Sequence, residues 1–157
     1  MGLFDRFISK RAEKLVHFHD FGYFTASIPF YESENWQEDE GFDILPLDNI
    51  KVTRFVNIRL YKGREALGSR SDGISKYTTY KEIRRLEPIY FYYISFKTEK
   101  EMSEKRSIIE NYFNNIKNEE NLISYYEEKN ILIVMHLNAS GYTDLFLDNI
   151  KKSIKLK

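Results

Sequence analysis

Two histidines stand two residues apart near the start of the chain, and their spacing suits metal binding. His17 and His19 project from the same face if this segment is a strand, because strand side chains alternate between faces. Two imidazoles so placed can chelate a transition metal, with Asp20 or His136 completing the ligand set. The competing interpretation is two half-exposed histidines at a strand end, and the absence of a second ligand pair of metal-site spacing favours it.

Other reactive patterns are weak. The segment from Gly63 to Arg70 carries two glycines, as a phosphate loop does, but it has no lysine after the second glycine. The chain contains no Gly-x-Ser-x-Gly sequence, and it contains no cysteine, which excludes thiol catalysis and sulfur-based zinc sites. We therefore predict no catalytic residue, no bound cofactor and no metal, with His17 and His19 as the alternative metal ligands.

Two neighbouring segments carry opposite charge and many aromatic residues. Residues 31–48 contain seven acidic residues and no basic one, and residues 62–87 contain seven basic residues and four acidic ones. We expect both segments to be irregular, with a loop followed by a short strand in residues 76–86, and such connections often carry function. Solvated loops with weak ion pairs, and aromatic rings used in the core, are the alternative. The candidate partner-binding residues are Trp36, Phe42, Arg64, Arg70, Tyr77 and Tyr80.

Composition limits the class of protein. With 157 residues, 42% hydrophobic and 31% charged, the chain is long enough for one globular domain with a real core. The 24 basic and 24 acidic residues balance, which argues against a dedicated nucleic-acid binder. No run approaches the roughly 18 apolar residues of a membrane span, and no secretory segment opens the chain. We expect a cytoplasmic protein that binds another protein, with an oligomeric state the sequence does not define.

Periodicity predicts an α+β domain in residues 16–157. The segments 16–30, 50–61, 88–96, 122–127 and 131–137 have strand patterns, and 98–118 and 143–154 have helical ones. In residues 50–61, even positions should face the core and odd positions a wetter surface, while residues 131–135 are apolar on both faces and should be central. Asn130 is the expected left-handed residue of the turn between the last two strands. Residues 1–15 have an amphipathic pattern that predicts a helix packed on the domain, or alternatively a membrane-surface or partner helix.

The order of elements resembles the Mog1/PsbP-like superfamily. The resemblance is carried by Phe24-Thr25-Ala26-Ser27-Ile28-Pro29 with Trp36 after it, by the strand from Ile50, and by the closing strand–helix–hairpin–helix. It implies a bent antiparallel sheet covered by helices, an α/β/α sandwich, and a non-catalytic binding or assembly role. The chain also resembles bacterial domains of this size whose mechanism is not known.

The sequence thus predicts a binding or assembly module that uses residues 31–48 and 62–87. The alternative is a small-ligand or metal-dependent enzyme that uses His17 and His19.

Overall fold

The computed structural model describes residues 16–40, 47, 50–71, 73, 76–116, 121–138 and 144–157. The predicted helix in residues 1–15 lies outside this part. Along the chain the elements are β1 (Val16–Asp20), β2 (Phe24–Pro29), the short 3-10 helix η1 (Ser33–Asn35), β3 (Gln37–Glu40), β4 (Val52–Ser71), β5 (Lys76–Ser95), α2 (Glu99–Ile116), β6 (Asn121–Glu128), β7 (Ile131–Asn138), α3 (Asp144–Ser153) and β8 (Lys155–Leu156).

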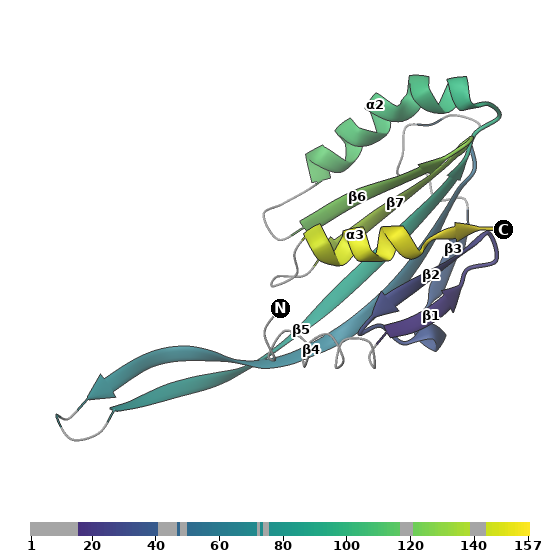
Figure 1. Cartoon of the computed structure of the whole chain (residues 1–157). Helices are drawn as coiled ribbons and strands as arrows, with labels where there is room; N and C mark the ends of the chain where they lie inside the picture. Colours follow the sequence, from purple (N-terminus) through teal and green to yellow (C-terminus); the bar gives the residue numbers. More distant parts are fainter. Residues whose placement is uncertain are drawn as a thin grey trace, which may run out of the picture.

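The described residues form one small domain with two antiparallel sheets and two helices, which confirms the predicted α+β class (Figure 1). The larger sheet has the order β3-β4-β5-β7-β6, and the smaller has the order β1-β2-β8. Gly22, at φ +88°, makes the turn between β1 and β2, a conformation that favours glycine. The strand pattern of residues 16–30 is therefore two strands joined at Gly22.

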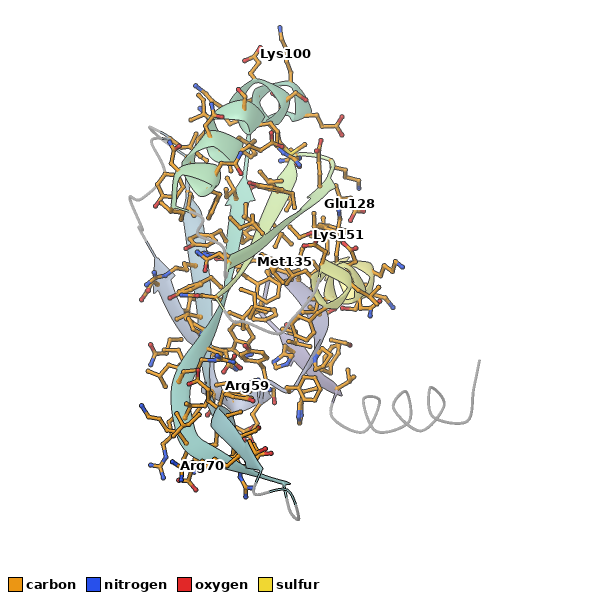
Figure 2. The ribbon with its side chains drawn as sticks, turned by 90° about the vertical axis from the view of Figure 1, so that its left-hand side faces the viewer. Arg59, Arg70, Lys100, Glu128, Met135 and Lys151 are labelled. Atoms are coloured by element: carbon orange, nitrogen blue, oxygen red, sulfur yellow. The ribbon has the colours of Figure 1, made fainter. Side chains whose placement is uncertain are left out.

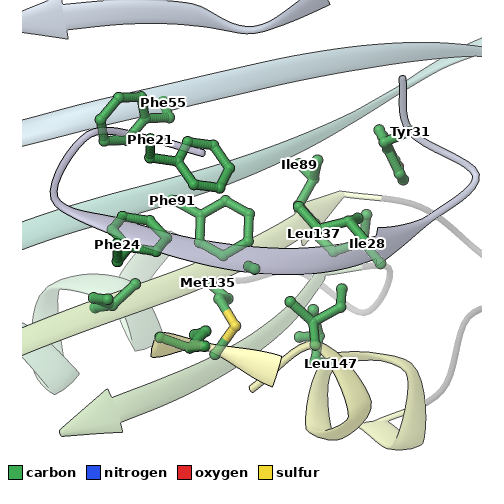
Figure 3. Packing of buried hydrophobic residues seen from close by; sticks show 14 residues of the cluster. Phe21, Phe24, Ile28, Tyr31, Phe55, Ile89, Phe91, Met135, Leu137 and Leu147 are labelled. Atoms are coloured by element: carbon green, nitrogen blue, oxygen red, sulfur yellow. The ribbon is translucent and has the colours of Figure 1, made fainter. Parts of the chain in front are cut away.

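Strand β7 separates two hydrophobic clusters, because its side chains alternate between them. Ile133, Met135 and Leu137 belong to the larger cluster (Figure 3), together with β2 and with Leu147 and Ile150 of α3. Leu132 and Val134 belong to the second cluster, with Met102, Ile109 and Phe113 of α2. The strand is buried from Leu132 to Leu137 and lies between β5 and β6, so the prediction of a central strand is confirmed.

Strands β4 and β5 form a long hairpin. The expected loop before residue 76 is wrong for residues 62–71, which belong to β4, whereas the expected strand at residues 76–86 is confirmed as part of β5. Their register runs without a break from Val52↔Ile94 to Ala66↔Tyr80, and continues after one irregularity to Ser71↔Lys76. The predicted short strand at residues 76–86 and the strand at 88–96 are one strand. The polar and glycine-containing sequence concealed this, since strands that cover no core lack an apolar alternation.

The predicted faces of β4 are also only partly correct. Thr53, Phe55 and Asn57, assigned to the wetter face, are buried, whereas Ile58 and Leu60, assigned to the core, are exposed. Phe55 is buried because the small sheet packs against it through Phe21 and Phe24. Ile58 and Leu60 belong to neither hydrophobic cluster, because the hairpin here has continued past the residues that pack on its faces.

A local capping signal explains where α2 begins. Thr98 Oγ1 accepts a hydrogen bond from the Glu101 N–H at 3.1 Å, as the capping pattern predicts. The helix is described as far as Ile116, and the predicted end at residue 118 lies outside the described residues.

In the β6–β7 turn, Lys129 has the positive φ (55°) that we assigned to Asn130. The Asn130 side chain instead donates to the Phe96 carbonyl at 2.5 Å, which holds this residue in place.

Candidate binding site on the β4–β5 arm

The distal part of the hairpin, Leu60–Ser71 paired with Lys76–Leu86, is hereafter called the arm. Figure 1 shows it projecting away from the other labelled elements. Strand β7 pairs with β5 only from Ile89 to Ser95, so within the described residues no third strand joins the arm. Its backbone hydrogen bonds are therefore those of a two-stranded ribbon, and both of its edges are open.

A buried carboxylate fixes the base of the arm. Glu87 is 1% exposed and forms ion pairs with Arg59 and with Arg85, the latter at 3.2 Å between Nε and Oε2. The Arg59 guanidinium also lies 5.6 Å from the centroid of the Phe30 ring, and Tyr31 Oη donates to the Glu87 carbonyl at 3.1 Å. These contacts connect the base of the arm to the end of β2, and Figure 2 labels Arg59 there.

One face of the arm begins with exposed aliphatic side chains. Leu60 pairs with Leu86 in the register, and the two are 49% and 65% exposed. Ile58, on the same face, is 47% exposed. Residues directly opposite in an antiparallel pair lie side by side, so these three make a continuous apolar patch. We call it the apolar base.

Cationic side chains follow the apolar base on the same face. Lys62 lies opposite Arg84, and Arg64 lies opposite Glu82, all four being exposed. Like charges directly opposite each other destabilise an antiparallel pair. The Lys62–Arg84 pair therefore does not stabilise the ribbon.

The opposite face is arranged around Gly63. A Cβ atom on Gly63 would lie 2.5 Å from Tyr61 Oη, so the tyrosine ring lies over this glycine. Arg85, opposite Tyr61 in the register, places its guanidinium 4.6 Å from the centroid of that ring. The Tyr61 ring packs over the strand at Gly63, where no side chain covers the backbone. This packing stabilises a ribbon that has no core beneath it. The segment Gly63–Arg70 is part of β4, which agrees with the rejection of a phosphate loop there.

The register shifts between Ala66 and Gly68, near the end of the arm. Leu67, inside the irregularity, is exposed. Beyond it the pairing resumes, and the hydroxyls of Ser69 and Thr78 lie 3.1 Å apart. This is a β-bulge, which increases the local twist of the strands.

Four of the six predicted partner-binding residues belong to the arm. Arg64, Arg70 and Tyr80 are exposed there, Figure 2 labels Arg70, and the backbone of Tyr77 pairs with that of Arg70. Phe42 lies outside the described residues. Leu60 and Leu86 were not predicted as binding residues. The one sequence signal that they lie outside the core was the continuation of the β4 alternation into a charged segment.

Trp36, the sixth candidate, lies elsewhere. It follows η1, and its ring is partly buried against Phe21 and Phe91, at centroid distances of 4.7 and 5.6 Å. Its Nε1 donates to Nδ1 of His19 at 2.6 Å. The acidic segment around it is not wholly irregular, as we had expected, since it contains η1 and the edge strand β3. The structure therefore does not bring Trp36 together with the arm candidates.

His17 and His19 share one face of β1, as predicted, but no third metal ligand joins them among the described residues. His19 is buried, and burial, assisted by the nearby His17 charge, lowers its pKa to about 4. The Lys157 ammonium binds the Asp20 carboxylate at 2.6 Å and lowers the pKa of that group. His136 packs in the α2 cluster region against Tyr90, and burial lowers its pKa to about 4 as well. Among the described residues no group of three potential metal ligands occurs.

A small hollow of about 150 Å³ is lined by His19 together with Trp36 and Glu38. His17 is not among its lining residues. The hollow therefore contains one of the two predicted imidazoles.

Comparison with protein-family models, with curated proteins and with solved structures gave no match to this chain. In the part of the chain that the structure describes, neither helix combines the length and apolar composition that crossing a membrane requires.

Proposed function

We propose that this protein is a non-catalytic binding or assembly module whose arm binds another protein. The observation that carries the proposal is the apolar base, an exposed Leu60–Leu86 pair on a ribbon that no other described element covers. Lys62 and Arg84 extend the same face. On the partner, a groove lined with aliphatic side chains and bordered by carboxylates would fit this order of side chains on the arm.

The physical basis is that the arm is unfavourable on its own. A two-stranded ribbon without a hydrophobic face against a core is at best marginally stable in water. Burying a leucine side chain contributes about 1.5–3 kcal/mol relative to leaving it exposed. A partner that covers Leu60 and Leu86 supplies the burial that the domain does not provide.

A protein partner fits better than a nucleic acid. The whole chain has no net charge, and the arm face begins with aliphatic residues, which have no role in contacting phosphates. Lys62 and Arg84 can instead pair with carboxylates at the edge of the interface, where charges determine specificity more than affinity.

The test uses the full chain, a cross-linking reagent and the native lysate. We expect Leu60→Asp with Leu86→Asp to abolish the specific cross-linked proteins that the wild type captures. The matched control is Phe18→Asp in β1, a residue 64% exposed and distant in sequence from the arm, which should keep them. Thermal melts establish that each variant is folded. Equal capture by the wild type and the double variant would contradict the proposal.

The α/β/α sandwich and the likeness to the Mog1/PsbP-like superfamily are part of the same proposal. Support comes from the two clusters, one containing α2 residues and the other α3 residues, with β7 contributing to both. An experimental structure of the full chain tests this arrangement directly.

The alternative function, a small-ligand or metal-dependent enzyme, has one observation in its favour, the hollow beside His19. Trp36 already donates a hydrogen bond to one imidazole nitrogen of His19, which leaves fewer groups for a metal or substrate. Calorimetric titration with Zn²⁺ tests it. Tight binding that is lost in both His17→Ala and His19→Ala would favour the enzyme over the binding module.

A further inference from the structure

The two edges of the five-stranded sheet differ in how they are protected. Edge strand β3 is short and carries three consecutive acidic residues, Glu38, Asp39 and Glu40. Short length and charge both discourage pairing with another strand. Edge strand β6 is twice as long and is uncharged from Asn121 to Tyr126. Only the β3 edge shows this protection.

A groove of about 700 Å³ lies beside the end of β6, where Tyr125, Tyr126 and Glu127 line it. Tyr125 and Tyr126 both line it, and adjacent strand residues point to opposite faces, so the groove passes around the open edge of the strand. Arg106 of α2 also lines it, as do Leu145, Asp148, Lys151 and Lys152 of α3. Figure 2 shows this side of the molecule, with Lys151 on α3 and Glu128 at the end of β6.

The charges in the groove are not balanced. Arg106 forms ion pairs with Glu110 at 2.9 Å and with Glu127 at 2.5 Å. Lys151 and Lys152 have no ion pair within the described residues, and Asp148 is the one further carboxylate in the lining. Among the residues that line the groove, the three cations Arg106, Lys151 and Lys152 therefore face two carboxylates, and the two lysines are the cations left for a ligand.

A further contact is available to a ligand in the groove. Leu145 is exposed, so an aliphatic side chain can pack on it.

We propose that an extended acidic peptide binds in this groove by adding a strand to β6. Its backbone pairs with the outward N–H and C=O groups of the edge strand, as in other strand-addition complexes. Its carboxylates lie against Lys151 and Lys152, and its aliphatic side chains pack on Leu145. This site is independent of the arm.

A second copy of the chain is a poorer occupant. Symmetric pairing of two β6 edges would bring the Lys151 and Lys152 side chains of both copies toward the same interface, where like charges repel. Light scattering of the protein alone tests this, and a dimer that Lys151→Glu with Lys152→Glu strengthens would overturn the peptide proposal.

The binding test uses three fluorescein-labelled heptapeptides and the full-length protein. One alternates Asp with Val, one alternates Lys with Val, and the third is the acidic peptide with every second backbone nitrogen methylated. Fluorescence anisotropy should show saturable binding of the acidic peptide only. Methylation removes the backbone donors needed for strand pairing, so it should weaken binding at least tenfold.

Variants assign the binding to the groove. Lys151→Glu with Lys152→Glu should weaken binding of the acidic peptide at least tenfold, whereas Lys62→Glu with Arg84→Glu on the arm should leave it unchanged. Amide chemical shifts of Leu122–Glu128 should change on titration. Equal binding of the acidic and basic peptides, full binding of the methylated one, or loss through the arm variant would each overturn the proposal. None of these outcomes affects the cross-linking test of the arm.

Discussion

The imidazoles of His19 and His136 are both buried, and burial lowers the pKa of each to about 4 from 6.5. In the unfolded chain both rings bind protons near pH 6.5. Between pH 6.5 and pH 4 the unfolded state therefore binds more protons than the folded state, and the free energy of unfolding falls as the pH falls. The stability contributed by neutral burial is fully present above pH 6.5.

The pH dependence can be measured by urea unfolding at pH 7.5, 6.0 and 4.5. Each histidine should contribute a loss of up to about 3 kcal/mol over this window. In His136→Phe, which retains a ring against Tyr90, the loss should be visibly smaller because one titrating group is gone. The same loss in the variant and in the wild type would show that His136 is not the cause.

The left-handed conformation of Lys129 gives a second prediction. A non-glycine residue at φ 55° is strained, and glycine is favoured at the first position of a two-residue hairpin turn with positive φ. Lys129→Gly should therefore stabilise the protein by about 1 kcal/mol, measured from the urea midpoint. Asn130→Gly is the control with the opposite sign, since it removes the hydrogen bond to the Phe96 carbonyl. If both variants destabilise, the backbone strain is not what matters at this turn.

At the scale of the elements, the arm depends on the buried Glu87. Removing the charge of a carboxylate between two arginines leaves them without their partner, and Glu87→Gln should destabilise the protein by about 2 kcal/mol. The arm amides should also exchange faster with deuterium, because the contacts to Arg59 and Arg85 fix its base. Glu82→Gln, on the exposed part of the arm, is the control and should change neither quantity. Unchanged exchange in Glu87→Gln would show that other contacts hold the arm.

The elements differ in how well the sequence predicts them, for a physical reason. Three elements bury apolar side chains in the core: the part of β5 after Pro88, strand β7 and helix α2. Their periodicity is therefore visible in the sequence. The arm covers no core, so its strands have no such pattern, and the glycines at 63 and 68 suggested a loop. Arg64 and Arg70 were predicted as binding residues from local charge. Leu60 was assigned to a core that ends before it, and Leu86 was only the last residue of a predicted short strand.

At the scale of the whole molecule, the domain should fold without its arm. Neither hydrophobic cluster contains a residue between Leu60 and Leu86. Replacing residues 63–83 with Asn-Gly joins Lys62 to Arg84, which already pair, through a turn that favours hairpins.

The shortened protein should unfold within about 1 kcal/mol of the wild type, because only exposed contacts are removed. Circular dichroism during urea unfolding measures this. The shortened protein keeps the Leu60–Leu86 and Lys62–Arg84 pairs, so it should still capture the cross-linked partners. The acidic peptide should still bind it at the β6 groove. A shortened protein that fails to fold would mean that the arm is part of the folding unit.

The bulge near Leu67 changes which residues a partner would touch. Even-numbered residues of β4 lie on the face of the apolar base as far as Ala66, which pairs with Tyr80, but beyond the bulge Ser69 occupies that face opposite Thr78. On β5 the even-numbered positions keep this face throughout. A substitution scan of β4 would therefore show a sensitivity that repeats every second residue and reverses its parity at Leu67, whereas a scan of β5 would keep one parity along its whole length.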